Sequence, residues 1–312
     1  MPRLKPIATA GRRGYTLVEL LFTMTLLGMV GAALISLLTQ QQRFYRDASN
    51  TVNVRRELRG AASLLPTEVR AISSTGGDVL EMDPTSFAFR ANIGSSIICD
   101  RSTMTPGTFL LPPQGLKAGN TLSSWYAAPA AGDAVFVFDE GAATGAEDDT
   151  WFATTVVSMV STTTGCHPSP YMSVTDDSPG VKPRWLVTVL PELPPTVRVG
   201  AGVRFGRPVR YQLYQPAGSP RWYVGYQQSV GGVWSGLEPV GGPLIGGGSG
   251  SGQGLAFQYY DTLGATATIA TSTALSRVDV ALRAVAGSDR ALGRQAPFSD
   301  SLLFRIGIRN FR

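Results

Sequence analysis

Glu19 is the residue near the N-terminus whose type and position most clearly indicate chemistry. It is a carboxylate at the start of an apolar segment, and no residue from Leu20 to Leu38 is charged. A carboxylate within such a segment is costly unless a partner neutralises it, so it indicates a functional site. Cleavage after Gly14 would supply a partner. The new α-amine of Tyr15 would carry a positive charge one helical turn from Glu19.

The sequence of residues 14–21, GYTLVELL, resembles the N-terminal signal of type IV prepilins and type II secretion pseudopilins. This resemblance implies cleavage between Gly14 and Tyr15 by a membrane aspartyl peptidase, followed by N-methylation of Tyr15. It also implies that Glu19 meets the terminal amine of a neighbouring subunit in a filament. The family usually has Phe where this chain has Tyr15, and the aromatic ring is kept.

Ordinary export signals are the main alternative, because they also combine a basic leader with an apolar segment. The leader contains Arg3, Lys5, Arg12 and Arg13. Residues 31–33 (Gly-Ala-Ala) would suit ordinary signal peptidase and would leave Leu34 as the first residue. A Glu inside the apolar segment is foreign to such signals and favours the prepilin interpretation. Uninterrupted hydrophobicity on all sides disfavours a core helix of a soluble protein.

These residues must be positioned by a long helix. Residues 15–38 are enough to cross a hydrocarbon layer of about 30 Å. We expect the helix to continue to about Ile72 as an amphipathic segment, with Pro66 kinking it or starting a new turn. Its apolar stripe, which should pack on the following sheet, consists of Phe44, Ala48, Thr51, Val54, Leu58, Ala61, Leu65, Val69 and Ile72.

In the remainder of the chain, short strand-like segments are separated by turn residues, which is the pattern of a β-rich domain. We expect a hairpin of strands 78–82 and 87–91 around a turn at 83–86, and further strands near 93–99, 134–138, 151–160, 185–190, 209–213, 222–226, 255–261, 278–283 and 304–309. Residues 241–254 are a flexible Gly-rich loop by composition. The fold class is therefore α+β. The expected parts are a leader (1–14), a membrane and assembly helix (15–38), an amphipathic helix (39–75) and a β-rich domain (76–312).

The C-terminal strands also resemble, less specifically, the same region of J-type pseudopilins and PilW-type minor pilins. This similarity lies in residues 255–264 and in the strand that begins at Arg277. The chain is longer than a typical major pilin, which favours a large minor subunit. The implied partners are other pilin or pseudopilin subunits, the prepilin peptidase and an inner-membrane assembly platform.

The net charge of +5 is concentrated in the leader. Without its four basic residues, 23 of the 27 basic side chains remain against 22 acidic ones. A nearly neutral mature protein disfavours nucleic acid as a partner. Basic residues flank the apolar segment on both sides, so charge does not decide its orientation. The resemblance implies a single-pass bacterial inner-membrane protein whose C-terminal domain lies outside the cytoplasm.

The two cysteines, Cys99 and Cys166, would then lie in an oxidising compartment, where they can form a disulfide or remain as buried thiols. Cys166 precedes His167, the one histidine. A structural zinc site needs four ligands, so a loop histidine explains His167 more simply than a metal. The chain has no Gly-x-Ser-x-Gly motif, and we expect it not to be an enzyme.

A run of carboxylates is a candidate binding site for calcium. Calcium binds six to eight oxygens from flexible loops. The candidate ligands are Asp139, Glu140, Glu147, Asp148 and Asp149. Their spacing differs from an EF-hand, and a solvated acidic loop is the other interpretation. No other cofactor is indicated.

The leading interpretation is a structural minor subunit of a type IV pilus or a type II secretion pseudopilus. The main alternative is a tip adhesin or a DNA-uptake module, which would expose an aromatic or basic patch on the β domain. A signal-anchored exported β domain is a further alternative. The aromatic residues that could form such a patch are Trp125, Tyr126, Trp222, Tyr223, Tyr226 and Trp234.

Overall fold

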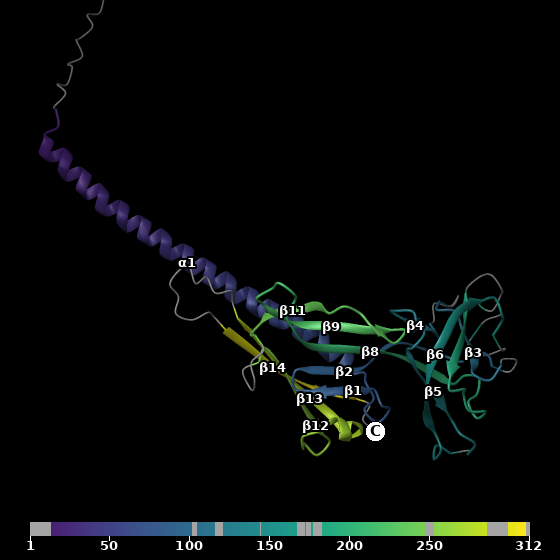
Figure 1. Ribbon diagram of the computed structural model, residues 1–312. Coiled ribbons are helices and arrows are strands. Elements are labelled where there is room, and N and C mark those ends of the chain that lie inside the picture. Colours follow the sequence, from purple (N-terminus) through teal and green to yellow (C-terminus); the bar gives the residue numbers. More distant parts are fainter. Residues whose placement is uncertain are drawn as a thin grey trace, which may run out of the picture. The chain divides into compact units, whose positions relative to one another are not determined.

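The computed structural model describes residues 14–101, 105–115, 121–143, 145–166, 172, 176, 183–246, 253–285 and 299–309. Most of the leader, His167 and residues 247–252 of the expected Gly-rich loop lie outside these ranges. The chain divides into two compact units, Met1–Val52 and Asn53–Arg312. The architecture is the expected α+β arrangement, in which a long N-terminal helix is followed by a large antiparallel sheet (Figure 1).

The helix α1 extends from Leu17 to Val69. The sequence predicted a helix from Tyr15 to about Ile72, so its ends differ by two or three residues. Pro66 lies inside α1 and does not end it. A proline removes only its own N–H from the ladder, and the amide of Arg70 still donates to the Pro66 carbonyl at 3.2 Å.

The C-terminal unit contains fourteen strands within the described residues. Their bounds are β1 Val79–Asp83, β2 Ser86–Ile97, β3 Thr108–Leu111, β4 Ser124–Trp125, β5 Ala134–Asp139, β6 Thr150–Thr162, β7 Arg184–Leu190, β8 Gly202–Tyr214, β9 Trp222–Val230, β10 Val233–Trp234, β11 Glu238–Leu244, β12 Leu255–Asp261, β13 Leu275–Val285 and β14 Ser299–Gly307. A short 3₁₀ helix, η1 (Ile269–Ala274), precedes β13.

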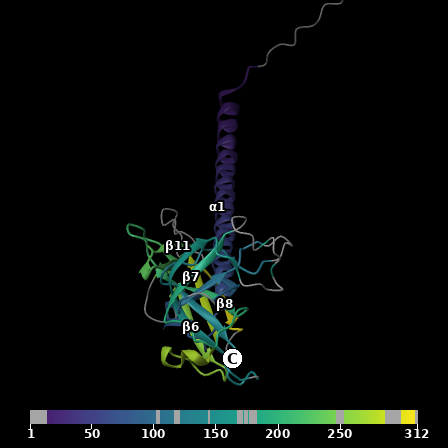
Figure 2. The ribbon, with the colours of Figure 1, turned by 90° about the vertical axis from the view of Figure 1, so that its right-hand side faces the viewer.

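The strands pair in the order β12-β13-β11-β9-β8-β5-β6-β7-β3, and every pairing is antiparallel. β14 also pairs with β13, and β2 pairs with β8. In the β1–β2 hairpin, Asp83 faces Ser86 across a Pro84–Thr85 turn, as the sequence predicted. Figure 2 views the sheet with β6 and β7 toward the reader.

One hydrophobic core forms where the last part of α1 packs on the sheet. Five helix side chains at steps of three or four residues are buried: Val54, Leu58, Ala61, Leu65 and Val69. They pack against residues of β1, β2, β8, β9 and β11 to β14, including Phe87, Phe89 and Phe257. We call this the helix core. Its stripe follows from the 3.6-residue period, which places such positions on one helix face.

The predicted stripe is correct from Val54 onward and wrong before it. Phe44 and Ala48 belong to the N-terminal unit and are exposed, and Thr51 is partly exposed. Periodicity predicts one apolar face along the whole helix, but only the positions from Val54 onward are buried, and these pack against strands.

A second core, the strand core, contains no helical residue. It lies among β3, β5, β6 and β7, with residues of the 193–201 connection. β2 and β8 are long enough to serve both cores. Val203 and Phe205 of β8 belong to the strand core, whereas Val209 and Tyr211 belong to the helix core.

Two ion pairs with buried carboxylates lie where β8 passes from one core to the other. Arg207 donates to both carboxylate oxygens of Asp133, at 2.9 and 2.7 Å. Arg204 donates to Asp78 Oδ2 at 2.7 Å, and the Asp78 side chain is fully buried. Paired charges with further hydrogen bonds are the form in which ionic groups tolerate burial.

The expected Gly-rich loop at 241–254 is wrong in its first part, because residues 241–244 belong to β11. A Cβ added to Gly241 would overlap the Cβ of Ala61. This strand therefore needs glycine where α1 crosses it closely. The short strands β3, β4 and β10 were also not predicted, and β2 is one strand where the sequence suggested two.

Candidate processing and assembly segment

The peptide bond between Gly14 and Tyr15 lies before the first residue of α1. Gly14, Tyr15 and Thr16 have no regular secondary structure, and the Tyr15 side chain is 84% exposed. A bond in this position is not held in the helical hydrogen-bond ladder. A peptidase can therefore reach it without unwinding α1.

Thr16 is the N-cap residue of α1, directly before its first helical residue. Its hydroxyl accepts the Glu19 amide at 3.3 Å, and its carbonyl accepts the Leu20 amide at 3.2 Å. This is the bonding of an N-cap residue, which satisfies amides that have no partner within the helix. The cap fixes the boundary that leaves the Gly14–Tyr15 bond outside α1.

Glu19 lies in the first turn of α1. A carboxylate there is favoured by the partial positive charge of the helix N-terminus. Glu19 is exposed, and it lies four residues after Tyr15. The side chain can therefore approach a cation that comes from outside the chain.

The apolar part of α1 has no cover within its own unit. No residue from Leu17 to Leu38 is buried, and 21 of the 22 are exposed. The large side chains include Phe22, Met24 and Ile35, which are 63 to 65% exposed. Water does not tolerate a continuous apolar surface of this size, so membrane lipid or other helices must cover it.

The polar side chains of this segment are satisfied locally. Thr23 donates to the Leu20 carbonyl at 2.9 Å, and Thr25 donates to the Phe22 carbonyl at 2.8 Å. These bonds remove the cost of placing a free hydroxyl in lipid. Within the described residues, one helix, α1, is both long enough and apolar enough to span a membrane.

Comparison with known proteins assigns this segment. A family model described as the prokaryotic N-terminal methylation motif matches residues 9–35. The N-terminus is that of a type IV prepilin or pseudopilin. No curated protein and no solved structure matches the chain.

The prepilin motif covers Gly14, Tyr15, Glu19 and most of the apolar segment. The motif supports a pilin-type or pseudopilin-type substrate of prepilin peptidase. Together with the apolar helix it describes a single-pass, membrane-anchored protein. The match ends at Ile35, before the C-terminal unit begins.

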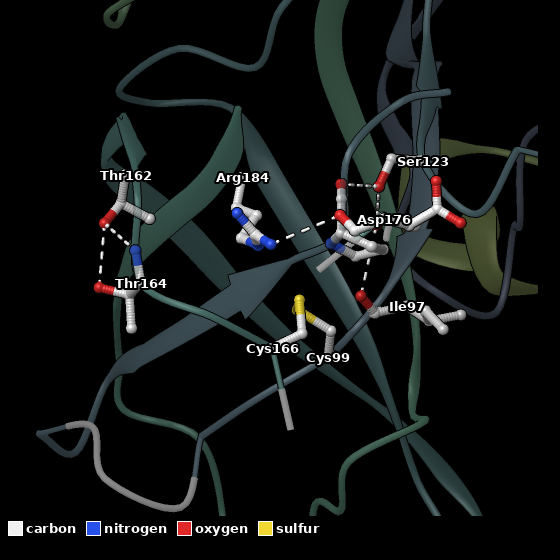
Figure 3. The surroundings of a disulfide bond; sticks show 10 residues. Ile97, Cys99, Ser123, Thr162, Thr164, Cys166, Asp176 and Arg184 are labelled. Carbon is white, nitrogen blue, oxygen red and sulfur yellow. Dashed lines mark hydrogen bonds between the residues drawn. A yellow bond between two sulfur atoms is a disulfide. The ribbon is translucent and has the colours of Figure 1, made fainter. Parts of the chain in front are cut away.

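In the C-terminal unit the two cysteines form a disulfide, Cys99–Cys166, with Cα atoms 5.1 Å apart (Figure 3). Cys99 follows β2 and Cys166 follows β6, so the bond links positions 67 residues apart. Both sulfurs pack with Leu110 in a small cluster. Closing a loop of this length stabilises a domain by about 4 kcal/mol in the chain-entropy model.

Two of the five acidic candidates for calcium, Asp139 and Asp148, accept hydrogen bonds from backbone amides or a hydroxyl group. Asp148 Oδ2 accepts the amides of Ala142 and Ala143 at 2.7 and 2.9 Å, and these bonds lower the pKa of Asp148. Asp139 accepts the Gly141 amide and the Thr196 hydroxyl at 3.0 and 2.7 Å. Within the described residues, no group of three or more His, Cys, Asp or Glu side chains is arranged to hold a metal ion.

Five of the six aromatic candidates are partly buried, and Tyr126 is the exposed one. Tyr126 is 72% exposed, whereas Trp222 and Tyr226 are partly buried against the helix core and Trp125 against the strand core. Trp234 lies under the Arg210 guanidinium at 4.6 Å.

Thr16 is the residue of the segment whose role the sequence reasoning missed. A signal was available, because Thr-x-x-Glu at positions 16 to 19 is the pattern of a capping box. The ion pairs Arg207–Asp133 and Arg204–Asp78 were missed as well. No local pattern announces them, because their partners lie 74 and 126 residues apart.

Proposed function

We propose that the chain is a structural minor subunit of a type IV pilus or a type II secretion pseudopilus. It is cleaved between Gly14 and Tyr15, methylated on Tyr15 and assembled through the apolar part of α1. The prepilin motif at residues 9–35 carries this proposal. The uncovered apolar helix surface from Leu17 to Leu38 supports it, because such a surface fits both lipid before assembly and neighbouring helices afterwards.

The role of the chain is to pack and not to catalyse. Gly28 and Gly31 would allow neighbouring helices to approach closely, since a Cβ at either position meets no atom of this chain within 4 Å. Glu19 would pair with the terminal amine of another subunit and so set the register of assembly, which is a well-attested use of a buried charge.

The C-terminal unit would lie outside the cytoplasm. The Cys99–Cys166 disulfide supports this orientation, because disulfides persist in oxidising compartments and are rare in the cytoplasm. Other subunits, the processing peptidase and an inner-membrane assembly platform would be the partners.

The N-terminal residue and mass of the protein purified from its own cell envelope test the processing step. A chain that begins at N-methylated Tyr15 is expected. A chain that begins at Leu34 would instead indicate ordinary secretion, and an uncleaved N-terminus would indicate a static anchor. Either of these outcomes would overturn the proposal.

Glu19→Ala tests the assembly step. We expect normal cleavage, because the Gly14–Tyr15 bond stays outside α1, but reduced incorporation into filaments. Glu57→Ala is the matched control, since Glu57 is an exposed carboxylate of the same helix outside the apolar segment. Normal incorporation of the Glu19 variant would refute the role of Glu19 in register.

A further inference from the structure

Four consecutive residues of α1, Arg43 to Arg46 (Arg-Phe-Tyr-Arg), form what we call the collar. All four side chains are exposed, and the rings of Phe44 and Tyr45 are 70 and 71% exposed. Consecutive helical residues are about 100° apart, so four of them surround the helix. The collar therefore presents a ring or a guanidinium on every side of α1.

The collar lies just beyond the apolar segment. Leu38 is the last apolar residue, and the uncharged residues 39–42 separate it from Arg43. Five residues of helix advance about 7.5 Å along the axis. The headgroup layer on each side of a bilayer is about 5 to 8 Å thick. When the apolar segment spans the hydrocarbon layer, Arg43 begins at the outer edge of the headgroups.

Helix geometry turns the collar side chains back toward the membrane. Each Cα–Cβ bond of an α-helix is tilted toward the helix N-terminus, and long side chains follow that direction. On the C-terminal side of the apolar segment, this direction leads from the collar to Leu38. Arg43 and Arg46 can therefore place their guanidinium groups in the headgroup layer while their Cα atoms lie beyond it.

The chemistry of the collar matches that layer. Aromatic side chains concentrate at membrane interfaces, and the Phe44 and Tyr45 rings lie edge to face with centroids 6.2 Å apart. One guanidinium group can donate hydrogen bonds to two phosphate oxygens at once. No salt bridge to Arg43 or Arg46 is found among the described residues.

We propose that the collar binds the phosphate groups of anionic phospholipids in the leaflet from which α1 emerges. The proposal rests on the proposed function only through the membrane-spanning helix. Arg43 and Arg46 do not help to orient the helix, because basic residues flank the apolar segment on both sides. Binding of lipid phosphate would give these two arginines a role. The adjoining apolar segment and the two aromatic rings favour lipid over a free anion or the carboxylates of a second subunit.

The test places a fluorescent label near the collar of the full-length protein in vesicles. Both native cysteines are in the disulfide, so Gln42→Cys offers a single reactive thiol. The vesicles contain phosphatidylcholine with phosphatidylglycerol, and a nitroxide quencher is attached to the headgroup of one lipid or the other. We expect quenching to favour labelled phosphatidylglycerol by about fivefold or more, since one arginine near an anionic surface contributes about that factor.

Two variants separate the collar from general charge. R43Q/R46Q is expected to reduce the preference to parity. R198Q/R221Q removes the same charge from exposed positions of the C-terminal unit and is expected to leave the preference unchanged. Equal quenching by both lipids in the wild-type chain, or an unchanged preference in R43Q/R46Q, would overturn the proposal and leave a second subunit's carboxylates as the occupant.

A label at Ser36→Cys distinguishes this failure from failure of the proposed function. We expect it to be quenched by a nitroxide on the lipid acyl chain. If it is not, α1 does not span the bilayer, and both the membrane anchor and the collar are refuted. If it is quenched while the collar shows no lipid preference, only the collar is refuted.

Discussion

The two ends of α1 are both apolar, yet their side chains have opposite surroundings. From Leu17 to Leu38, apolar residues occupy every side of the helix and none is buried. From Val54 to Val69, apolar residues recur at steps of three or four, and five of them are buried against strands. Hydrophobic content alone therefore does not specify the partner of a helix.

The distribution of apolar residues around the helix decides the partner. An all-round apolar surface can be satisfied by lipid or by several helices, because both meet it from every direction. A single stripe can be satisfied by one sheet. The same helix thus carries an assembly surface at one end and a folding surface at the other, and variants at matched positions should separate the two.

The largest expected difference is between Leu65→Ala and Leu26→Ala. Leu65 is fully buried in the helix core, whereas Leu26 is 46% exposed. Leu65→Ala should lower the free energy of unfolding of the C-terminal unit by about 3 kcal/mol, from lost transfer energy and a new cavity. Leu26→Ala should leave that free energy unchanged.

Urea unfolding of the full-length protein in detergent measures both effects through tryptophan fluorescence. All five tryptophans lie between Trp125 and Trp234, so the signal reports the C-terminal unit alone. If Leu26→Ala destabilised that unit as much as Leu65→Ala, the proposed separation of the two surfaces would be wrong.

The next largest expected difference is between Gly241→Ala and Gly28→Ala. Gly241→Ala should destabilise the C-terminal unit by about 2 kcal/mol, because the new Cβ would overlap Ala61 of α1. Combining it with Ala61→Gly should cost less than the sum of the two single changes, since the second substitution removes the overlapping atom.

Gly28→Ala is the matched control in the apolar segment. Its new Cβ would meet no atom of this chain within 4 Å, so unfolding of the C-terminal unit should not change. The same urea measurement applies. Strictly additive costs for Gly241→Ala and Ala61→Gly would show that close packing of α1 on β11 is not what requires the glycine.

The smallest effect concerns Glu68, near the C-terminal end of α1. Its Oε2 accepts the Tyr211 hydroxyl at 3.0 Å, and burial raises its pKa. The folded state therefore holds the Glu68 proton more tightly than the unfolded state does. The resulting stabilisation is complete below the usual carboxyl pKa and is lost as the pH rises through the raised pKa.

Glu68→Gln should remove this pH dependence while keeping an oxygen that accepts from Tyr211. As the pH rises above the usual carboxyl pKa, the free energy of unfolding should fall more steeply for the wild type than for the variant, by an amount that corresponds to less than one bound proton. Exposed Glu57→Gln serves as the control. Identical slopes for Glu68→Gln and the wild type would show that Glu68 has no raised pKa in the folded state.

Local patterns in the sequence predicted the parts of the molecule that local patterns determine. The apolar segment, the stripe from Val54 onward and the alternating strands β12 to β14 were predicted because helical and strand periods are visible in the chain. The methylation motif was visible for the same reason, since its residues are contiguous.

Features that depend on distant residues were not predictable in this way. Gly241 belongs to a loop by composition, but it pairs with Val224 of β9 within β11 and lies close to Ala61 of α1. The sequence suggested two strands, 87–91 and 93–99, whereas β2 is one strand whose register with β8 shifts between Asn92 and Gly94. The pairing of Arg207 with Asp133 likewise depends on a sheet order that no short pattern contains.

The continuity of α1 from the apolar segment into the helix core has a mechanical consequence. One hydrogen-bonded helix joins Leu17 to Val69 with no intervening loop. Tension applied near Glu19 is therefore transmitted along the backbone to the five buried side chains of the stripe.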